Sequence, residues 1–222
     1  IDISNGVFFQ GPGSPALYQG RIMVPNANIK SFYDAKSGTQ YANEKGTVTV
    51  ISNTDNIEQT LTTTLNNPSY CYVANNEMYI VCSGGQSVEN AKTVVKSEGG
   101  IEVYSYPALA HLATINLGLS LPSRMVISDN YGYLGTSIKS ALLKVDLVNR
   151  KVINGIDNPI VLNAGSSSMV SAIGLTSTGW LFAGDFSDDT IHVVDIRKGD
   201  TVDNWIYKTP FKIPAGVPGF AG

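Results

Sequence analysis

The sequence predicts an all-β fold, and three observations support that prediction. Short runs of aromatic and β-branched residues recur along the chain, for example at Tyr70–Ala74 and Met78–Cys82, and such residues favour a pleated, half-buried surface. Loops rich in proline, glycine and asparagine separate these runs, and these residues favour turns. No segment shows apolar residues at the 3.6-residue spacing of an amphipathic helix. We therefore expect strands joined by turns.

The same order of strands returns four times along the chain. The last strand of each repeat ends, in chain order, at Ser52, Ser105, Asp146 and Asp195, with spacings of 53, 41 and 49 residues. Four-stranded units that repeat every ~40–50 residues are typical of β-propeller blades. The sequence thus predicts a single β-propeller of four-stranded antiparallel blades, with about four blades. The repeats span residues 3–52, 57–106, 110–147 and 152–196, and residues 203–213 form a surplus strand.

The second repeat shows how the strands are predicted. Pro68 lacks an N–H and disfavours helical angles in the preceding residue, so a strand begins after it. Asn75, Asn76 and Glu77 supply a tight reversal. Gly100–Ser105 alternates apolar with polar residues, which predicts an outer strand with one packed face. The other strands are expected at Ile3–Phe9, Ala16–Tyr18, Arg21–Val24, Gly46–Ile51, Ile57–Leu65, Ala110–Leu117, Arg124–Ser128, Gly132–Thr136, Ala141–Asp146, Val152–Leu162, Met169–Thr176, Trp180–Ala183, Thr190–Asp195 and Trp205–Ile213.

The surplus strand leaves two arrangements open. In a small closed ring of four blades, Trp205–Ile213 replaces or supplements Ile3–Phe9, because a propeller closes when strands from both termini share a blade. Alternatively, the chain is part of a six- to eight-bladed propeller. We favour this second arrangement, since four blades is the small extreme of the propeller class. Another chain or another segment of the same propeller then covers the open faces, or the chain self-associates through open blade edges.

Composition argues against two classes of partner. The net charge is −3 and no Lys/Arg cluster is present, so nothing attracts a nucleic-acid backbone. No apolar run approaches the roughly 20 residues that cross a bilayer as a helix. Only 15% of the residues are charged, while Thr, Ser, Asn, Gly and Tyr are abundant. We therefore expect an extracytoplasmic protein that is secreted, periplasmic or displayed on a cell surface.

Cys71 and Cys82 lie on neighbouring strands of one predicted hairpin. They face each other, as a disulfide requires, if Asn76 and Glu77 form the turn, and they miss each other if Asn75 and Asn76 form it. The alternative that we favour is two buried free thiols, because free cysteine packs well as a small apolar residue.

Chemical motifs are few. The sequence has no His-Glu-x-x-His, Cys-x-x-Cys, Gly-x-Ser-x-Gly or Walker-type motif. The best metal candidate is the loop that contains Asp185, Asp188 and Asp189, whose three carboxylates could bind Ca²⁺. The favoured alternative is a polar hairpin loop, because aspartate is common in turns.

Two long polar loops, Pro25–Lys45 and Ser83–Gly99, occupy the same place in the first two repeats, between the third and fourth expected strands. Equivalent loops leave a propeller on the same face, so we expect them side by side. Long loops on a rigid scaffold usually serve function. We predict a protein-binding surface at Phe32, Tyr33 and Tyr41, and the alternative is that these aromatic residues pack their own loop against the blade.

The segments GTVTVISNT at residues 46–54 and TIHVVD at residues 190–195, with the pattern of a proline followed by an apolar hairpin, resemble the YVTN/YncE-like β-propeller repeats. Broader relatives include NHL and SMP-30-type propellers. The resemblance covers most of the chain in a degenerate form. It implies a propeller of a secreted, periplasmic or surface protein that serves in binding, although a minority of such proteins are enzymes.

Three functions fit these observations. We favour a non-enzymatic binding or assembly module of a secreted or cell-surface protein. The first alternative is a metal-dependent hydrolase or lactonase of the SMP-30 type. The second is a structural subunit of an extracellular polymer, suggested by the surplus strand and by an expected surface rich in Thr, Asn and Tyr.

Overall fold

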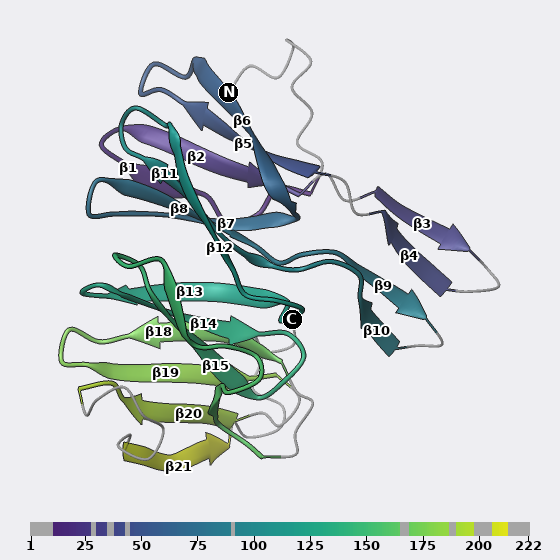
Figure 1. The fold of residues 1–222 in the computed structure, drawn as a ribbon, viewed down its shortest axis with the longest axis vertical. Helices are drawn as coiled ribbons and strands as arrows, with labels where there is room; N and C mark the ends of the chain where they lie inside the picture. Colours follow the sequence, from purple (N-terminus) through teal and green to yellow (C-terminus); the bar gives the residue numbers. More distant parts are fainter. Residues whose placement is uncertain are drawn as a thin grey trace. The chain divides into compact units, whose positions relative to one another are not determined.

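The computed structural model describes residues 11–27, 30–34, 38–42, 45–89, 92–164, 169–186, 190–197 and 206–212. Within these ranges the chain is all-β and contains no helix, and hence none that could span a membrane. The predicted β-propeller fold class is confirmed by sheets of antiparallel strands in sequence order (Figure 1). The chain divides into two compact units, Ile1–Ser123 and Arg124–Gly222.

Unit 1 contains two blades of four strands. Blade 1 consists of β1 (Ala16–Tyr18), β2 (Arg21–Asn26), β5 (Lys45–Ile51) and β6 (Ile57–Asn66). Blade 2 consists of β7 (Pro68–Ala74), β8 (Glu77–Cys82), β11 (Gly100–Ser105) and β12 (His111–Asn116). One apolar core lies between the facing sides of the two sheets and includes Met23, Val48 and Val50 of blade 1 and Cys71, Met78 and Ile80 of blade 2.

Unit 2 repeats this plan. Blade 3 consists of β13 (Pro122–Ser128), β14 (Tyr131–Thr136), β15 (Ala141–Asp146) and β16 (Lys151–Asn154), and the short β17 (Ile160–Val161) also pairs with β15. Blade 4 consists of β18 (Val170–Leu175), β19 (Trp180–Asp185), β20 (Thr190–Asp195) and β21 (Ile206–Lys212). The core of this unit includes Tyr133 and Leu142 of blade 3 and Leu181 and Val194 of blade 4.

The strand pairing moves the expected repeat boundaries by one strand. β6 pairs with β5, so Ile57–Asn66 is the last strand of blade 1 and does not open the second repeat. Likewise β21 pairs with β20, so the expected surplus strand is the last strand of blade 4. The segment Ile3–Phe9 lies outside the described residues. The shift follows from burial, because β11 is buried on both faces whereas β6 exposes most of its first half.

The four residues that set the predicted periodicity share one local role. Ser52, Ser105, Asp146 and Asp195 each end or directly follow the third strand of a blade. In every case the side-chain oxygen accepts a hydrogen bond from a backbone N–H two to five residues further along the chain. Ser and Asp commonly form such turns. The sequence period therefore marks the capped turn that leads into each outer strand.

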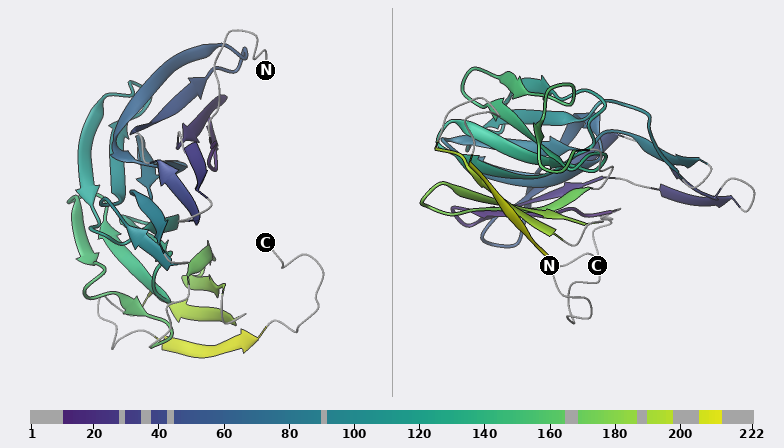
Figure 2. Two further views of the ribbon diagram at one scale, coloured as in Figure 1. Left: turned by 90° about the vertical axis from the view of Figure 1, so that its right-hand side faces the viewer. Right: turned by 90° about the horizontal axis from the view of Figure 1, so that it is seen from below.

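Each long loop folds into a two-stranded hairpin, β3 (Lys30–Asp34) with β4 (Gly38–Ala42) and β9 (Gln86–Glu89) with β10 (Lys92–Val95). β4 contacts β9, so the hairpins lie side by side as predicted, and both extend away from the sheets of unit 1 (Figures 1 and 2). Phe32 and Tyr33 belong to β3 and Tyr41 to β4. Their side chains lie outside the described part of the chain, so the protein-binding surface assigned to them stays a prediction.

The turn between β7 and β8 decides the state of the cysteines. Asn75 and Asn76 form it, with φ of 53° and 58°, so Cys71 pairs with Ile80 rather than with Cys82. Both cysteines are free and buried. The disulfide alternative is wrong, and the alternative of two buried thiols is confirmed. Burial raises the pKa of the Cys71 thiol, and burial together with the nearby charge of Glu102 raises the pKa of the Cys82 thiol.

Both thiols are expected to resist a disulfide reagent such as DTNB in the native protein at mildly alkaline pH. The thiolate is the reactive species, and burial with a raised pKa removes both access and charge. Absorbance of the released thiolate, with and without denaturant, measures the reaction. A Cys71→Ala variant should release half as much on unfolding. Fast reaction of the native protein would show instead that the hairpin β7–β8 opens readily.

Candidate binding pocket

The third strands of the four blades can be aligned by counting back from Ser52, Ser105, Asp146 and Asp195. Two residues before these positions stand Val50, Val103, Lys144 and Val193. All four are buried, and Lys144 exposes only 2% of its surface. Lysine is almost never fully buried unless its charge is compensated. Blade 3 thus carries a cation at a core position where the other blades carry valine.

Two tyrosines on the neighbouring strand β14 contact this lysine. The Nζ of Lys144 lies 4.2 Å from the ring centroid of Tyr131 and 5.5 Å from that of Tyr133. The register of the sheet explains both contacts, because Tyr133 pairs with Lys144 and Tyr131 pairs with Asp146. The negative face of an aromatic ring attracts a cation at these distances. The tyrosines therefore compensate part of the cost of burying the charge.

Asp146 adds a nearby carboxylate at the end of the same strand. Its pKa lies below the usual value, chiefly because the backbone N–H of Asn149 donates to it, and the charge of Lys144 adds to this effect. Asp146 also caps the turn into β16 through its hydrogen bonds to Val148 and Asn149. The carboxylate thus caps the turn and also interacts electrostatically with the lysine.

Lys144 lines a pocket of about 660 Å³ in unit 2. The volume falls in the range of about 300–1,000 Å³ that is typical of small-molecule sites. The lining contains two cations, Lys144 and Arg197, and one acidic side chain, Asp129. The hydroxyl-bearing residues of the lining are Ser128, Tyr131, Tyr133, Thr176, Ser177 and Thr178, and the remaining lining residues are Ile127, Leu175, Gly179 and Ile196. The pocket therefore offers many hydrogen-bonding groups.

Arg197 is held in a fixed position at this pocket. Its Nε donates to Oδ1 of the buried Asp195 at 2.6 Å, and its Nη2 donates to Oδ2. The guanidinium carbon lies 4.9 Å from the ring centroid of Trp180. Gly179, with a φ of +80°, approaches it closely, since an added Cβ would lie 2.7 Å from Cγ of Arg197. About half of the Arg197 side chain stays exposed.

The corresponding place in unit 1 holds different residues. Arg21 is the first residue after the β1–β2 turn, as Tyr131 is after the β13–β14 turn. Tyr106 directly follows the third strand of blade 2, as Ile196 follows that of blade 4. The backbone N–H of Tyr106 donates to the carbonyl oxygen of Asn76 in the β7–β8 turn at 2.9 Å. In the same way, the backbone N–H of Ile196 donates to the carbonyl oxygen of Gly179 in the β18–β19 turn at 3.0 Å. The equivalence therefore rests on hydrogen bonding as well as on counting.

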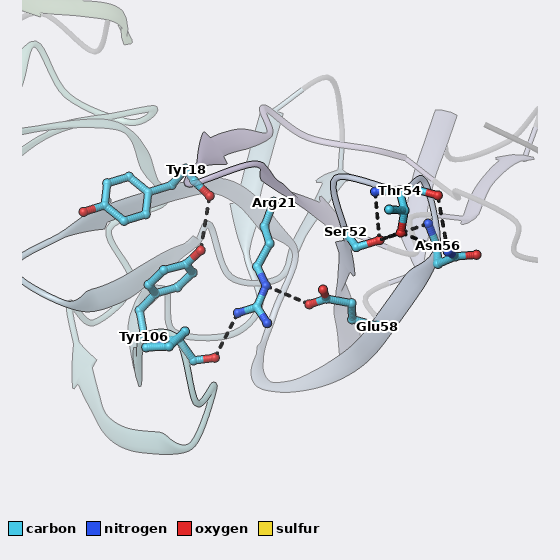
Figure 3. A network of polar contacts seen from close by, with 8 residues as sticks. Tyr18, Arg21, Ser52, Thr54, Asn56, Glu58 and Tyr106 are labelled. Atoms are coloured by element: carbon cyan, nitrogen blue, oxygen red, sulfur yellow. Dashed lines mark hydrogen bonds and ion pairs between the residues drawn. The ribbon is translucent and has the colours of Figure 1, made fainter.

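In unit 1 these residues form a network of polar contacts (Figure 3). The Nε of Arg21 lies 2.8 Å from Oε2 of Glu58, and its Nη1 donates to the carbonyl oxygen of Pro107 at 3.2 Å. The guanidinium carbon lies 5.8 Å from the ring centroid of Tyr106. Tyr106 donates its hydroxyl to the carbonyl oxygen of Tyr18 at 3.1 Å, and the two rings meet edge to face.

The aspartates of the predicted metal loop are described only in part. Asp188 and Asp189 lie outside the described residues, so the Ca²⁺ site stays a prediction. Asp185 ends β19 and is buried, and its carboxylate accepts a hydrogen bond from the hydroxyl of Ser140. Its Oδ2 lies 3.7 Å from Nε2 of His192. Among the residues that the structure describes, no three His, Cys, Asp or Glu side chains gather as metal ligands would.

The residues that line the pocket are not among those predicted from the sequence. A signal for Lys144 was present, because aligning the four capped strand ends places it in a column of valines. Arg197 gives no such signal, since its role depends on the ion pair with Asp195 and on the approach of Gly179.

Comparison with known proteins finds similar folds but gives no information on the pocket. No protein-family model matches the chain, and no curated protein sequence matches it. The computationally designed protein Ika4 is 12% identical with a TM-score of 0.57, over 85% of this chain and 92% of that one. A structural genomics protein of unknown function from Bacteroides thetaiotaomicron is 11% identical with a TM-score of 0.54, over 86% of this chain. This chain spans 42% of that protein. At such identities the likeness concerns the fold alone.

Proposed function

We propose that this chain is a non-enzymatic binding module of a secreted or cell-surface protein and that the pocket of unit 2 is its ligand site. The observation that carries the proposal is the buried Lys144 at the pocket, in the position where the other blades have valine. Burying a charge costs free energy even when it is partly compensated. A lysine at this position therefore supports a role beyond packing.

The lining suits a small ligand that carries hydroxyl groups. Two tyrosine rings and the hydroxyls of Thr176, Ser177 and Thr178 surround the space, and a few fixed polar groups among aromatic side chains are typical of such sites. The low content of charged residues supports an extracytoplasmic location. The segments GTVTVISNT and TIHVVD support membership of the YVTN/YncE-like repeats, whose relatives serve mostly in binding.

The site can be tested with three probes that share one sugar ring: glucose, glucuronate and glucose 6-phosphate. We expect at least one of them to shift the backbone amide NMR signals of Lys144 and Gly179, with a Kd on the order of 1 mM or tighter. A Ser177→Trp variant places an indole at the exposed turn beside the pocket and should abolish these shifts. Ala108→Trp places the same residue in an exposed turn of unit 1 and should leave them unchanged. Absence of shifts with all three probes would contradict the proposal.

A further inference from the structure

We infer that the pocket of unit 2 binds an uncharged ligand with adjacent hydroxyl groups, as a neutral sugar has, and that Asp129 recognises these hydroxyls. The inference rests on the proposed function and adds to it the class of ligand and a residue that selects it. Asp129 lines the pocket and lies in the exposed turn between β13 and β14. An ionised carboxylate has two oxygens that only accept hydrogen bonds, so it can bind two neighbouring hydroxyls at once.

The carboxylate of Asp129 is free to accept the hydroxyls of a ligand. In the part of the chain that the structure describes, it makes no hydrogen bond and no ion pair. The side-chain hydroxyls of Ser128, Tyr131 and Ser177 line the same pocket and also have no hydrogen-bond partner among the described residues. These four side chains lie at or beside the turns β13–β14 and β18–β19. The pocket therefore presents polar groups whose hydrogen bonds a ligand with several hydroxyls can complete.

The charged groups of the pocket favour a ligand of neither sign. Arg197 donates to both carboxylate oxygens of Asp195, so its charge is paired within the chain. Lys144 interacts electrostatically with the carboxylate of Asp146. An anionic ligand would meet the negative charge of Asp129, and a cationic ligand would meet the positive charges of Lys144 and Arg197. A hydroxyl avoids both costs, because it donates to a carboxylate and accepts from a cation.

Arg197 supplies donors that complement the acceptor Asp129. Its Nε and Nη2 bind Asp195, and the guanidinium has two further N–H groups on Nη1. About half of the side chain is exposed, and it lines the same pocket as Asp129. The ion pair and the contact with the ring of Trp180 hold the guanidinium in place before a ligand arrives. Fixed binding groups lose little conformational entropy on binding, which favours affinity.

Calorimetric titration with glucose, glucuronate and glucosamine at mildly acidic pH tests the inference, because the three probes share one ring and differ in charge. We expect neither charged probe to bind more than about 5-fold more tightly than glucose. Asp129→Asn should weaken glucose binding about 10-fold, since a hydrogen bond to a charged acceptor is stronger than one to an amide. Asparagine also tolerates the φ of 49° at this position. Asp157→Asn, in an exposed loop of unit 2 outside the pocket lining, is the matched control and should leave the Kd unchanged.

The outcomes separate this inference from the proposed function. Absence of binding with every probe would overturn both. If glucose binds and Ser177→Trp abolishes the binding, but Asp129→Asn leaves the Kd unchanged, the ligand site stands and the role of Asp129 is wrong. A charged probe that binds 10-fold or more tightly than glucose would overturn the uncharged class of ligand. Cyclohexanol, a ring with a single hydroxyl, should not displace glucose, and displacement at equal concentration would show that adjacent hydroxyls are not required.

Discussion

Replacing Glu102 by alanine is expected to destabilise unit 1 by about 3–5 kcal/mol, the usual cost of leaving the partners of a buried charge unsatisfied. Glu102 is fully buried in β11. Its Oε1 accepts hydrogen bonds from the backbone N–H groups of Thr64 and Leu65, at 2.5 and 2.7 Å, and from the Thr64 hydroxyl at 2.8 Å. Its Oε2 accepts the hydroxyl of Tyr104 at 2.9 Å. One carboxylate thus joins β11 of blade 2 to β6 of blade 1.

Two milder variants should lose less stability than the alanine variant. Glu102→Gln keeps a carbonyl oxygen for the backbone N–H groups and should cost about 1–2 kcal/mol. Tyr104→Phe removes a single donor and should cost about 1 kcal/mol. Urea unfolding, followed through a signal from unit 1, gives the free energies. If the alanine variant cost no more than Tyr104→Phe, the carboxylate would not be the link between the two blades.

Glu102 also shows where the sequence misleads. The alternation of Gly100–Ser105 is the usual sign of a strand with one wet face, but β11 is buried on both faces. The polar residue in the pattern faces the neighbouring blade, where donors of β6 satisfy it. Periodicity cannot distinguish water from a partner strand as the source of hydrogen bonds. That ambiguity explains why the predicted repeat boundaries are one strand early.

What the sequence predicts well depends on local chemistry. The capped turns at Ser52, Ser105, Asp146 and Asp195 are local, so their spacing reveals the blades. The cysteine register depends on which asparagine pair forms one turn, so the sequence leaves two answers open. The pocket depends on side chains from four separate strands and turns of unit 2. Only the position of Lys144 within its strand carries a trace of it in the sequence.

A second large effect is expected at Gly46. This glycine is buried in β5 and packs against Pro68. An added Cβ would lie 2.1 Å from Cδ and 2.3 Å from Cγ of Pro68, and 2.6 Å from the carbonyl oxygen of Asn26. Pro68 begins β7, so this contact sets how closely blade 2 approaches blade 1.

Gly46→Ala should therefore destabilise unit 1 by about 2–4 kcal/mol, as overpacking of a core contact does. Gly174→Ala is the matched control, because an added Cβ at this position of β18 meets no atom within 4 Å, and it should change stability by no more than about 0.5 kcal/mol. Adding Pro68→Ala to Gly46→Ala removes Cγ and Cδ but not the carbonyl oxygen of Asn26, so it should restore only part of the loss. Equal unfolding free energies for the two glycine variants would show that the sheets of unit 1 can separate to admit a methyl group, and that Pro68 does not fix their spacing.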